Sequence, residues 1–376
     1  MRILIVGSGS YVLGDLYGPG VILRSVVQWL LTETDTAEHN ISISYNSSGM
    51  LGKKQAAIDA VFSQMGAGSR VTYDLVSSSE AEQIIKSKET DACFISVPDK
   101  HHAHYIKAGM EQNVPVWVVK PLTGDDTHSK ELVAIQRRTG ARVWVDYHKR
   151  FDVSNRLLKK QVEDQELGRL LAYSVDYHQP RTLPIDVFDW TADVGVFTYI
   201  GCHYVDQVFY LFPEAKLVSV SAEPLKGEVF AKTGQFDGVL ATLAFETLGG
   251  TIVCPMNVGW FNPKGAPTKS LQTLKVQFER GLVELDQTRR GVHIWHDDGV
   301  SEINPYFFCA APDAFGQTKF SGYGYDSVKY FLEIVHTRGA WPTQQNLPSL
   351  QEAAKTDFVV SAVQNALRSG EKIVFD

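Results

Sequence analysis

Short apolar segments alternate with helix-like segments from residue 2 to residue 145, and this alternation constrains the fold more than any other feature of the chain. The apolar segments are predicted strands: Arg2–Val6, Ile41–Tyr45, Val71–Leu75, Ala92–Val97, Val114–Val119 and Arg142–Val145. The segments between them predict helices: Val21–Leu31, Lys53–Gln64, Ser79–Lys88, His102–Gln112 and Asp126–Thr139. Strands that alternate with helices form right-handed crossovers, which give a doubly wound parallel sheet and an α/β fold.

The pattern changes after Phe151, where strand-like segments follow one another with few helices between them. We predict strands of a mostly antiparallel sheet at Leu170–His178, Leu217–Ala222, Gly238–Phe245, Thr251–Trp260, Leu274–Glu279 and Val292–Trp295. Helices are predicted at Val153–Glu163, Phe197–Leu211, Ser327–Thr337 and Ser349–Leu367, the last two packing on this sheet or returning to the first domain. A chain of 376 residues is long enough for two cores. We therefore expect domains at residues 1–150 and 151–376.

A glycine turn follows the first predicted strand. Gly7 and Gly9 supply the first half of the G-x-G-x-x-G pattern that binds the pyrophosphate of a dinucleotide in Rossmann folds, but the third glycine position holds Val12. The turn therefore departs from the fingerprint, and we expect a longer loop. With the alternation behind it, the pattern predicts a dinucleotide site that includes Gly7, Gly9, Ser10 and Tyr11.

The end of the second predicted strand bears on the choice between NAD and NADP. NAD-binding Rossmann domains usually carry a carboxylate there, which binds the ribose 2′-hydroxyl. Here the segment holds Asn46, Ser47 and Ser48, followed by Lys53 and Lys54. Serines and lysines can bind a 2′-phosphate, so we favour NADP over NAD; the alternative is that the lysines are solvated residues at a helix start.

Charge and hydropathy exclude several other classes. A formal net charge of −7 gives no basic field for nucleic acid or anionic lipid. No apolar run approaches the roughly 20 residues of a membrane helix. The first residues run directly into a strand without the features of a secretory signal, so we expect a cytoplasmic protein. The cluster His101, His102 and His104 lacks carboxylate or cysteine partners in ligand spacing, so no metal site is predicted.

Several motifs in order resemble those of the Gfo/Idh/MocA family, which includes glucose-fructose oxidoreductase and inositol dehydrogenase. They are Pro98-Asp99-Lys100-His101-His102 (family Pro-Asn-x-x-His), Val119-Lys120-Pro121 (family Glu-Lys-Pro), the stretch YHKRF at 147–151, and Gly201-Cys202-His203-Tyr204-Val205-Asp206. The resemblance implies a Rossmann domain followed by an α/β domain with a large open sheet that often forms homodimers or homotetramers. It also implies cofactor contacts at Val97, Pro98, His102, Lys120 and Pro121.

Catalytic candidates come from two of these motifs. Lys120 follows an apolar strand at the edge where open α/β sheets bind ligands, and by resemblance it contacts the substrate hydroxyl. In related dehydrogenases a helix carries Asp-x-x-x-His, whose histidine exchanges the hydroxyl proton. His203 matches that histidine, but Tyr199 stands at the aspartate position. Either Asp206 or Asp193 takes over, or the mechanism has shifted; from the helix alone, His203 also fits a core histidine.

Substrate contacts are expected at two further places. His148, Lys149 and Arg150 follow a predicted strand together with Asp146, where the family builds part of its substrate site and where interdomain ion pairs are an equal alternative. His178 and Arg181 end the first strand of the second domain and can bind hydroxyl groups. Lys120 and His203 complete the set.

These observations predict an NAD(P)-dependent dehydrogenase or reductase that acts on the CH–OH group of a sugar, cyclitol or sugar derivative. Two alternatives remain open. One is an imine or enal reductase on the same scaffold, which suits the missing aspartate because Tyr199 can donate a proton. The other is a non-catalytic dinucleotide-binding regulator, against which Lys120 and His203 argue.

Overall fold

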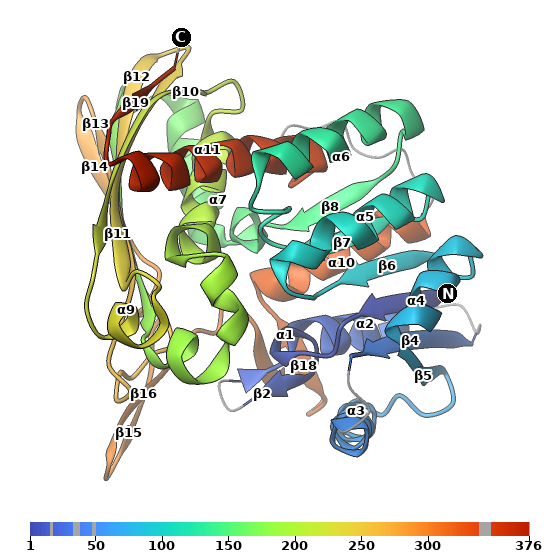
Figure 1. The fold of residues 1–376 in the computed structure, drawn as a ribbon. Coiled ribbons are helices and arrows are strands. Elements are labelled where there is room, and N and C mark those ends of the chain that lie inside the picture. The colour runs from blue at the N-terminus through green and yellow to red at the C-terminus, as the bar shows by residue number, and fades with distance from the viewer. Residues whose placement is uncertain (16–17, 33–37, 47–49, 338–346, 376) are drawn as a thin grey trace. The chain divides into compact units, whose positions relative to one another are not determined.

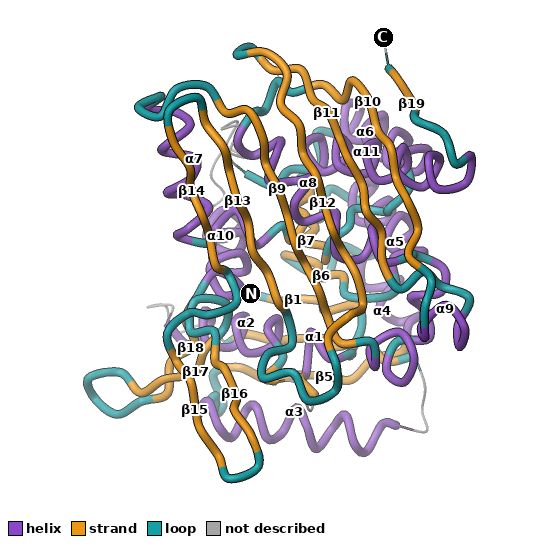
Figure 2. The backbone as a smooth tube through the Cα atoms, turned by 90° about the vertical axis from the view of Figure 1, so that its left-hand side faces the viewer, coloured by secondary structure: helices purple, strands orange, loops and turns teal. Residues whose placement is uncertain are grey.

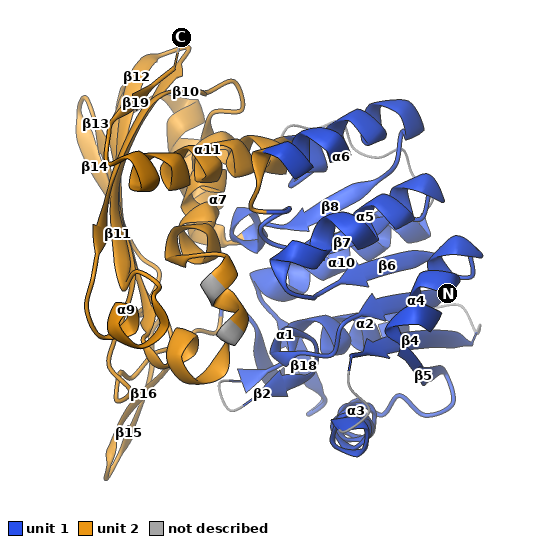
Figure 3. Cartoon of the chain, in the orientation of Figure 1, with its two compact units in different colours: residues 1–123, 127–151, 306–351 blue, residues 124–126, 152–305, 352–376 orange. Residues whose placement is uncertain are grey.

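The computed structural model describes residues 1–15, 18–32, 38–46, 50–337 and 347–375. The chain forms two compact units, which Figure 3 colours blue and orange. Unit 1 contains residues 1–123, 127–151 and 306–351, and unit 2 contains residues 124–126, 152–305 and 352–376. The chain passes from unit 1 to unit 2 after residue 151, and the sequence led us to expect a boundary after residue 150. Residues 306–351, however, belong to unit 1 and not to the second domain to which the sequence assigned them.

Unit 1 is built on a six-stranded parallel sheet, in agreement with the predicted doubly wound fold (Figure 1). Its strands in spatial order are β5 (Val71–Ser77), β4 (His39–Tyr45), β1 (Arg2–Val6), β6 (Ala92–Ile95), β7 (Val116–Val119) and β8 (Val143–Asp146). The order reverses between β1 and β6, because the chain first builds outward to β5 and then returns to the other side of β1. Such a switch point is where open α/β sheets bind ligands at the carboxyl ends of the strands.

Helices cover both faces of this sheet. They are α2 (Val21–Thr32), α3 (Leu51–Met65), α4 (Ser78–Lys86), α5 (His102–Glu111), α6 (Asp126–Thr139) and α10 (Tyr323–His336). Register places Phe94, Trp117 and Trp144 side by side on one face, and Phe331 of α10 packs on Phe94 with ring centroids 5.3 Å apart. Because neighbours along a strand face opposite sides, Val116 points to the other face, where it contacts Gly109 of α5. The late helix α10 thus completes the core of unit 1.

Unit 2 holds a seven-stranded sheet, seen face-on in Figure 2. Its order is β14 (Gly281–Asp286), β13 (Leu271–Phe278), β9 (Leu170–Pro180), β12 (Gly250–Asn262), β11 (Gly238–Thr247), β10 (Lys216–Leu225) and β19 (Ile373–Val374). Only the β9–β12 pair is parallel, so the prediction of a mostly antiparallel sheet is confirmed. The unit's helices are α7 (Val153–Asp164), α8 (Cys202–Leu211), α9 (Glu228–Thr233) and α11 (Leu350–Ser369).

One predicted strand exists but pairs with a different strand from the one expected. Val292–Trp295 does not join the large sheet; it lies in β15 (Val292–His296), whose only partner strand among the described residues is β16 (Gly299–Ile303), in a separate hairpin. Trp295 is 80% exposed there, because a two-stranded hairpin leaves both of its faces uncovered. The large sheet instead takes β14 as its edge strand, which the sequence did not predict.

Two features are absent from the described residues. None of the helices in the described ranges combines the length and the apolar character that a membrane span needs. No group of three or more histidine, cysteine or acidic side chains in those ranges is arranged to hold a metal ion.

Candidate functional site

Gly7 lies where the ends of three strands of unit 1 meet. It follows β1 with a φ of +107°, and its N–H donates to Ser44 Oγ of β4 at 2.8 Å. A Cβ on Gly7 would lie 2.0 Å from the carbonyl oxygen of Ser96, just after β6. Both the positive φ and the close approach require glycine. Gly7 therefore sits at the switch point between β1 and β6.

Gly9 opens a single helical turn, α1 (Ser10–Leu13), which lies between β1 and α2. The Gly9 carbonyl accepts the N–H groups of Val12 and Leu13 at 3.0 Å, and both of those side chains are buried. Unlike Gly7, Gly9 has open space where a Cβ would project. Val12, at the third glycine position, packs into the core. The chain then makes the short pair β2 (Gly14–Asp15) and β3 (Gly18–Pro19) before α2, so the expected longer loop is present.

A lysine from α3 reaches this turn. Lys54 Nζ donates to Ser8 Oγ at 2.7 Å, and burial lowers the pKa of Lys54. Its neighbour Lys53 is exposed. At the end of β4, Asn46 accepts a hydrogen bond from Ser78 Oγ at 3.1 Å, while the predicted cofactor residues Ser47 and Ser48 lie outside the described residues. Of the two lysines considered for a 2′-phosphate, only Lys54 contacts the glycine turn in the structure.

His102 connects the segments that follow β6 and β7. Its Nε2 lies 2.9 Å from the carbonyl oxygen of Val97, and its Nδ1 lies 3.0 Å from that of Pro121. The ring is fully buried. Carbonyl oxygens only accept hydrogen bonds, so both nitrogens face acceptors and the ring acts as a clamp between two main-chain segments. This clamp fixes Pro98 and Lys120, the other predicted cofactor contacts, to one edge of the sheet; the Lys120–Pro121 peptide is cis.

Asp99 is a buried carboxyl group that sequence reasoning noted only as part of a motif. It is 6% exposed, and its Oδ2 has no hydrogen-bond partner. Burial raises the pKa of Asp99, while the charges of His102 and Lys120 act in the opposite direction. The motif Pro-Asp-x-x-His could have pointed to this carboxyl group, because the family has asparagine where this chain has Asp99.

A hydrogen-bonded cluster lies at the end of β8. Asp146 is 1% exposed and accepts from Tyr11 Oη at 2.8 Å and from Ser327 Oγ at 2.7 Å. His148 Nδ1 lies 3.2 Å from Asp146 Oδ2 and 3.3 Å from Tyr11 Oη. The structure therefore brings a predicted cofactor residue and a predicted substrate residue together on one carboxylate.

The other two predicted substrate residues at the end of β8 have different surroundings. Lys149 and Arg150 are both 2% exposed. Arg150 Nη1 donates to the main-chain carbonyl of Leu347 at 3.2 Å. The structure thus gives Arg150 a main-chain contact within unit 1, a role the sequence did not anticipate.

In unit 2, a π-helical turn (Phe197–Gly201) precedes α8 and changes the helical phase between Tyr199 and His203. Tyr199 packs against Trp260 and Trp190, with ring centroids 5.2 and 5.7 Å apart. His203 is buried beside Tyr177, with centroids 6.4 Å apart. Asp206, one of the two residues expected to take over from the family aspartate, is fully buried in α8. Because a π turn is wider than an α turn, a spacing of four residues does not align Tyr199 with His203 as it would in a regular helix.

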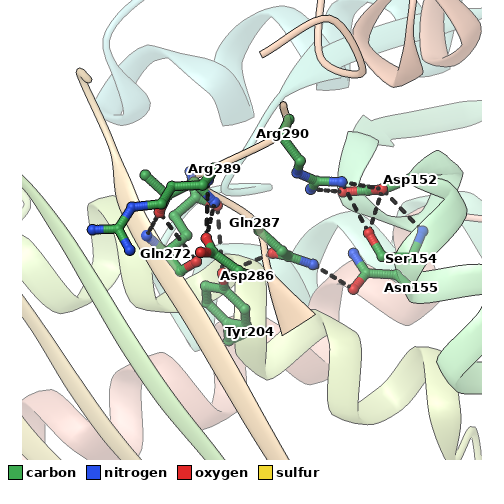
Figure 4. A network of polar contacts seen from close by, with 10 residues as sticks. Asp152, Ser154, Asn155, Tyr204, Gln272, Asp286, Gln287, Arg289 and Arg290 are labelled. Atoms are coloured by element: carbon green, nitrogen blue, oxygen red, sulfur yellow. Dashed lines mark hydrogen bonds and ion pairs between the residues drawn. The ribbon is translucent and has the colours of Figure 1, made fainter. Parts of the chain in front are cut away.

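A polar network holds α8 within unit 2 (Figure 4). Tyr204, next to His203, donates to Gln287 at 3.0 Å, and Gln287 donates to Asn155 of α7 at 2.8 Å. At the start of α7, Asp152 forms a buried ion pair with Arg290 at 2.6 Å and caps the helix through Ser154 N. These bonds fix the position of the helix that carries His203.

The remaining substrate candidates lie on β9 and just after it. His178 packs edge-on against Phe261 at 5.2 Å, and burial lowers its pKa while Asp176 and Asn257 raise it. Arg181 is largely exposed and pairs with Glu228 at 3.4 Å. An exposed ion pair of this kind contributes little to stability, so the Arg181 guanidinium can exchange partners at low cost.

Both parts of the chain match family models. Residues 37–147 match the oxidoreductase family with an NAD-binding Rossmann fold, and residues 155–284 match the GFO/IDH/MocA C-terminal domain.

Individual relatives agree with these matches. The uncharacterized oxidoreductase YrbE of Bacillus subtilis is 25% identical over 61% of this chain and 66% of its own length. An inositol 2-dehydrogenase of Corynebacterium glutamicum is 26% identical over 57% of this chain and 60% of its own length. The chain thus spans less than two thirds of the length of these curated relatives. Among solved structures, this chain is similar to scyllo-inositol dehydrogenase from Lactobacillus casei with bound NAD(H) and scyllo-inositol, with a TM-score of 0.70 and 15% identity. The match covers 99% of this chain and 98% of that one, so the two chains share a fold.

Proposed function

The chain belongs to the Gfo/Idh/MocA family of oxidoreductases, and from this premise we propose that it transfers a hydride between a nicotinamide dinucleotide and a carbinol carbon of a sugar, cyclitol or sugar derivative. The substrate class rests on the named relatives, several of which are inositol dehydrogenases. The bound cofactor would supply or accept the hydride at its nicotinamide C4.

The glycine turn is the observation that carries this proposal. Gly7 allows β1 and β6 to approach each other, and Gly9 leaves open space where its Cβ would project, so the backbone can come close to a pyrophosphate. These features fit a dinucleotide. Dinucleotide-binding folds recognise the ribose at the end of the strand that corresponds to β4. A bound dinucleotide would therefore have its adenosine half on the β4 side of β1 and its nicotinamide half over β6, β7 and β8.

Lys120 follows β7 on the nicotinamide side, where its ammonium group would polarise the oxygen of the reacting carbinol. The hydroxyl proton would pass to a histidine. Two histidines are candidates for this step: His203 of α8, which the resemblance implies, and His148, which lies at the end of β8.

Binding and turnover test the proposal directly. Fluorescence titration with NADPH and NADH should give saturable binding, and a spectrophotometric screen over sugars and cyclitols should identify a substrate. Lys120→Ala should abolish turnover, whereas Lys107→Ala, which removes an exposed lysine of the same unit, should not. Failure to bind either dinucleotide would refute the proposed function. Binding without turnover on any substrate would indicate the non-catalytic regulator.

For the cofactor we propose NADP over NAD. Tyr45 and Asn46 offer no carboxylate at the end of β4, and Lys54 stands beside Ser8 of the glycine turn. Lys54→Ala should weaken NADPH binding by about ten- to a hundredfold, because a hydrogen bond to a charged group is worth about 1.5–3 kcal/mol, and should leave NADH binding unchanged. Lys53→Ala is the matched control, since Lys53 is exposed. Equal losses for both cofactors would contradict the assignment.

Reduction of an imine or enal is the second candidate reaction, favoured by Tyr199 at the position of the family aspartate. Such a reaction needs only a proton donor, and a tyrosine hydroxyl can serve. Including imines and enals in the NADPH-coupled screen distinguishes the two. Turnover of these substrates but of no carbinol would select the second candidate.

We also propose that the chain forms a homodimer or homotetramer in the cytoplasm. Apolar side chains on the sheet of unit 2 are 37–53% exposed, and a second copy would cover them: Leu171, Leu240, Val253, Leu271 and Leu282. Light scattering coupled to size-exclusion chromatography measures the oligomeric state, and cell fractionation tests the location.

A further inference from the structure

The contacts of Asp146 determine how His148 presents its ring. A carboxylate only accepts hydrogen bonds, so Tyr11 Oη–H and His148 Nδ1–H both donate to Asp146 Oδ2, while Ser327 donates to Oδ1. With its proton on Nδ1, a neutral His148 carries its lone pair on Nε2. This is the arrangement in which a buried aspartate orients a histidine that acts as a general base.

Aromatic rings fix the plane of the same imidazole. The ring of Tyr323 stacks on His148 with centroids 5.5 Å apart and an interplanar angle of 24°. Phe307 lies 5.2 Å away in a tilted arrangement. Together with Asp146 and Tyr11, these contacts restrain both the position and the rotation of the ring. The His148 side chain nevertheless keeps 12% of its surface exposed, so protons can exchange with solvent.

The cluster lies at the end of β8, at the sheet edge over which the nicotinamide half of the proposed cofactor would extend. β7 and β8 are paired in parallel with Val119 opposite Asp146, so Lys120 and His148 follow neighbouring strand ends. Tyr11 comes from α1, which begins at the glycine turn after β1, and still reaches Asp146. The cluster therefore spans the carboxyl edge from β1 to β8, over which the nicotinamide half would lie.

We propose that His148, oriented by Asp146 and Tyr11, is the histidine that exchanges the substrate's hydroxyl proton in this chain, a role that the resemblance gives to His203. The inference rests on the proposed hydride transfer. In the oxidative direction the O–H bond breaks and its proton binds His148 Nε2, while the C–H electron pair leaves as hydride to the nicotinamide C4. The electron pair left on the oxygen forms the carbonyl C=O bond as the hydride departs, and His148 then releases its proton to solvent. Asp146 and Tyr11 are positioning residues, since they act through the imidazole.

Kinetics of matched variants test this assignment. His148→Ala should lower kcat by about 10²–10⁴-fold, the usual contribution of general acid–base catalysis, without changing dinucleotide affinity in the fluorescence titration. Added imidazole should restore part of the kcat of His148→Ala and none of that of His203→Ala. His148→Gln keeps the side-chain volume and should lose the same activity if the fold is intact. His104→Ala, which removes an exposed histidine of α5, should behave as the wild type.

A spectroscopic measurement checks the geometry without turnover. In ¹⁵N-histidine-labelled protein, the His148 signals, assigned by their absence in His148→Gln, should report a proton on Nδ1. Asp146→Asn, which can donate from its amide, should shift the proton toward Nε2. A His148 ring protonated on Nε2 in the neutral wild type would contradict the proposed orientation.

The outcomes separate this inference from the proposed function. No dinucleotide binding by the wild type refutes the proposed function and the role of His148 with it. Binding and turnover with a His148→Ala kcat within threefold of wild type, or imidazole rescue of His203→Ala alone, overturns only the role of His148.

Discussion

The two glycines of the turn should respond in opposite ways to the same substitution. In Gly7→Ala the new Cβ would lie 2.0 Å from Ser96 O, whereas real Cβ contacts stay above 3.0 Å, so β1 and β6 must separate locally. The positive φ costs about 1–3 kcal/mol, overpacking costs about 1–3 kcal/mol, and the displaced hydrogen bond to Ser44 costs about 1 kcal/mol. We expect a loss of about 3–7 kcal/mol in the free energy of unfolding, a large share of the 5–15 kcal/mol typical of a domain.

Gly9→Ala should leave the fold intact and impair binding. Gly9 has a φ of −82° and a ψ of −171°, which alanine adopts, and its Cβ would meet nothing within 4 Å. Stability should be unchanged or rise by up to about 1 kcal/mol. The methyl group would instead occupy the space through which the backbone approaches the pyrophosphate, so NAD(P)H affinity should fall at least tenfold.

Urea unfolding followed by tryptophan fluorescence, together with NAD(P)H titration, measures both effects in the same proteins. If Gly9→Ala binds the dinucleotide as the wild type does, the backbone does not approach the cofactor at this point. If Gly7→Ala unfolds at the wild-type urea concentration, the ends of β1 and β6 accommodate the added Cβ without loss of stability.

Three further predictions concern buried or half-buried ionisable groups. Asp152→Ala should lower the free energy of unfolding, measured in urea, by about 3–5 kcal/mol, because it leaves the buried guanidinium of Arg290 without its carboxylate. Adding Arg290→Met to this variant should recover most of the loss. Burial raises the pKa of Asp99 above 3.8, so the wild type should lose stability as the pH rises from 3.8 through the raised pKa. Asp99→Asn should therefore be more stable than the wild type at neutral pH. Urea unfolding midpoints of both proteins at pH 4 and pH 7 check this. Burial lowers the pKa of His178 below 6.5, so stability should fall as the pH drops from 6.5 toward the lowered pKa. His178→Gln should lose this dependence of stability on pH, and a variant whose stability falls with pH as steeply as that of the wild type would contradict the prediction.

The fold of unit 1 was predictable because its signals are local. The strands β1, β6, β7 and β8 are buried on both faces and are therefore nearly continuous apolar runs, and the crossover helices show their own periodicity. The sequence does not reveal the partner of an element. Val292–Trp295 alternates as a sheet strand does, yet it pairs only within its hairpin. Likewise the apolar face of α10, with Phe331 at its centre, fits any sheet, and only the structure shows that it covers Phe94 and Trp144.

The candidate site likewise has features that local sequence predicts and features that depend on contacts between distant residues. Parallel strands bring their carboxyl ends to one edge, so Gly7, Lys120 and His148 could be assigned to a common edge from their positions after predicted strands. Which side chain binds which depends on pairs far apart in the chain. Asp146 lies 135 residues from Tyr11 and 181 residues from Ser327, and no spacing rule connects them.

The segment 306–351 explains why the sequence alone could not assign the acid–base histidine. Ser327, Tyr323 and Phe307 all belong to it, and each fixes either Asp146 or the ring of His148. Once this segment is placed in the second domain, as the sequence suggested, His148 is a polar residue after a strand with no defined orientation. Because the segment 306–351 belongs to unit 1, it supplies the hydroxyl donor to Asp146 and the rings that pack on His148. These contacts define the tautomer of His148. Ser327→Ala removes the contact to Asp146 that comes from farthest along the chain. This variant should weaken the preference of the His148 proton for Nδ1 in the ¹⁵N spectrum. An unchanged spectrum would show that Tyr11 and the aromatic rings suffice to fix the tautomer.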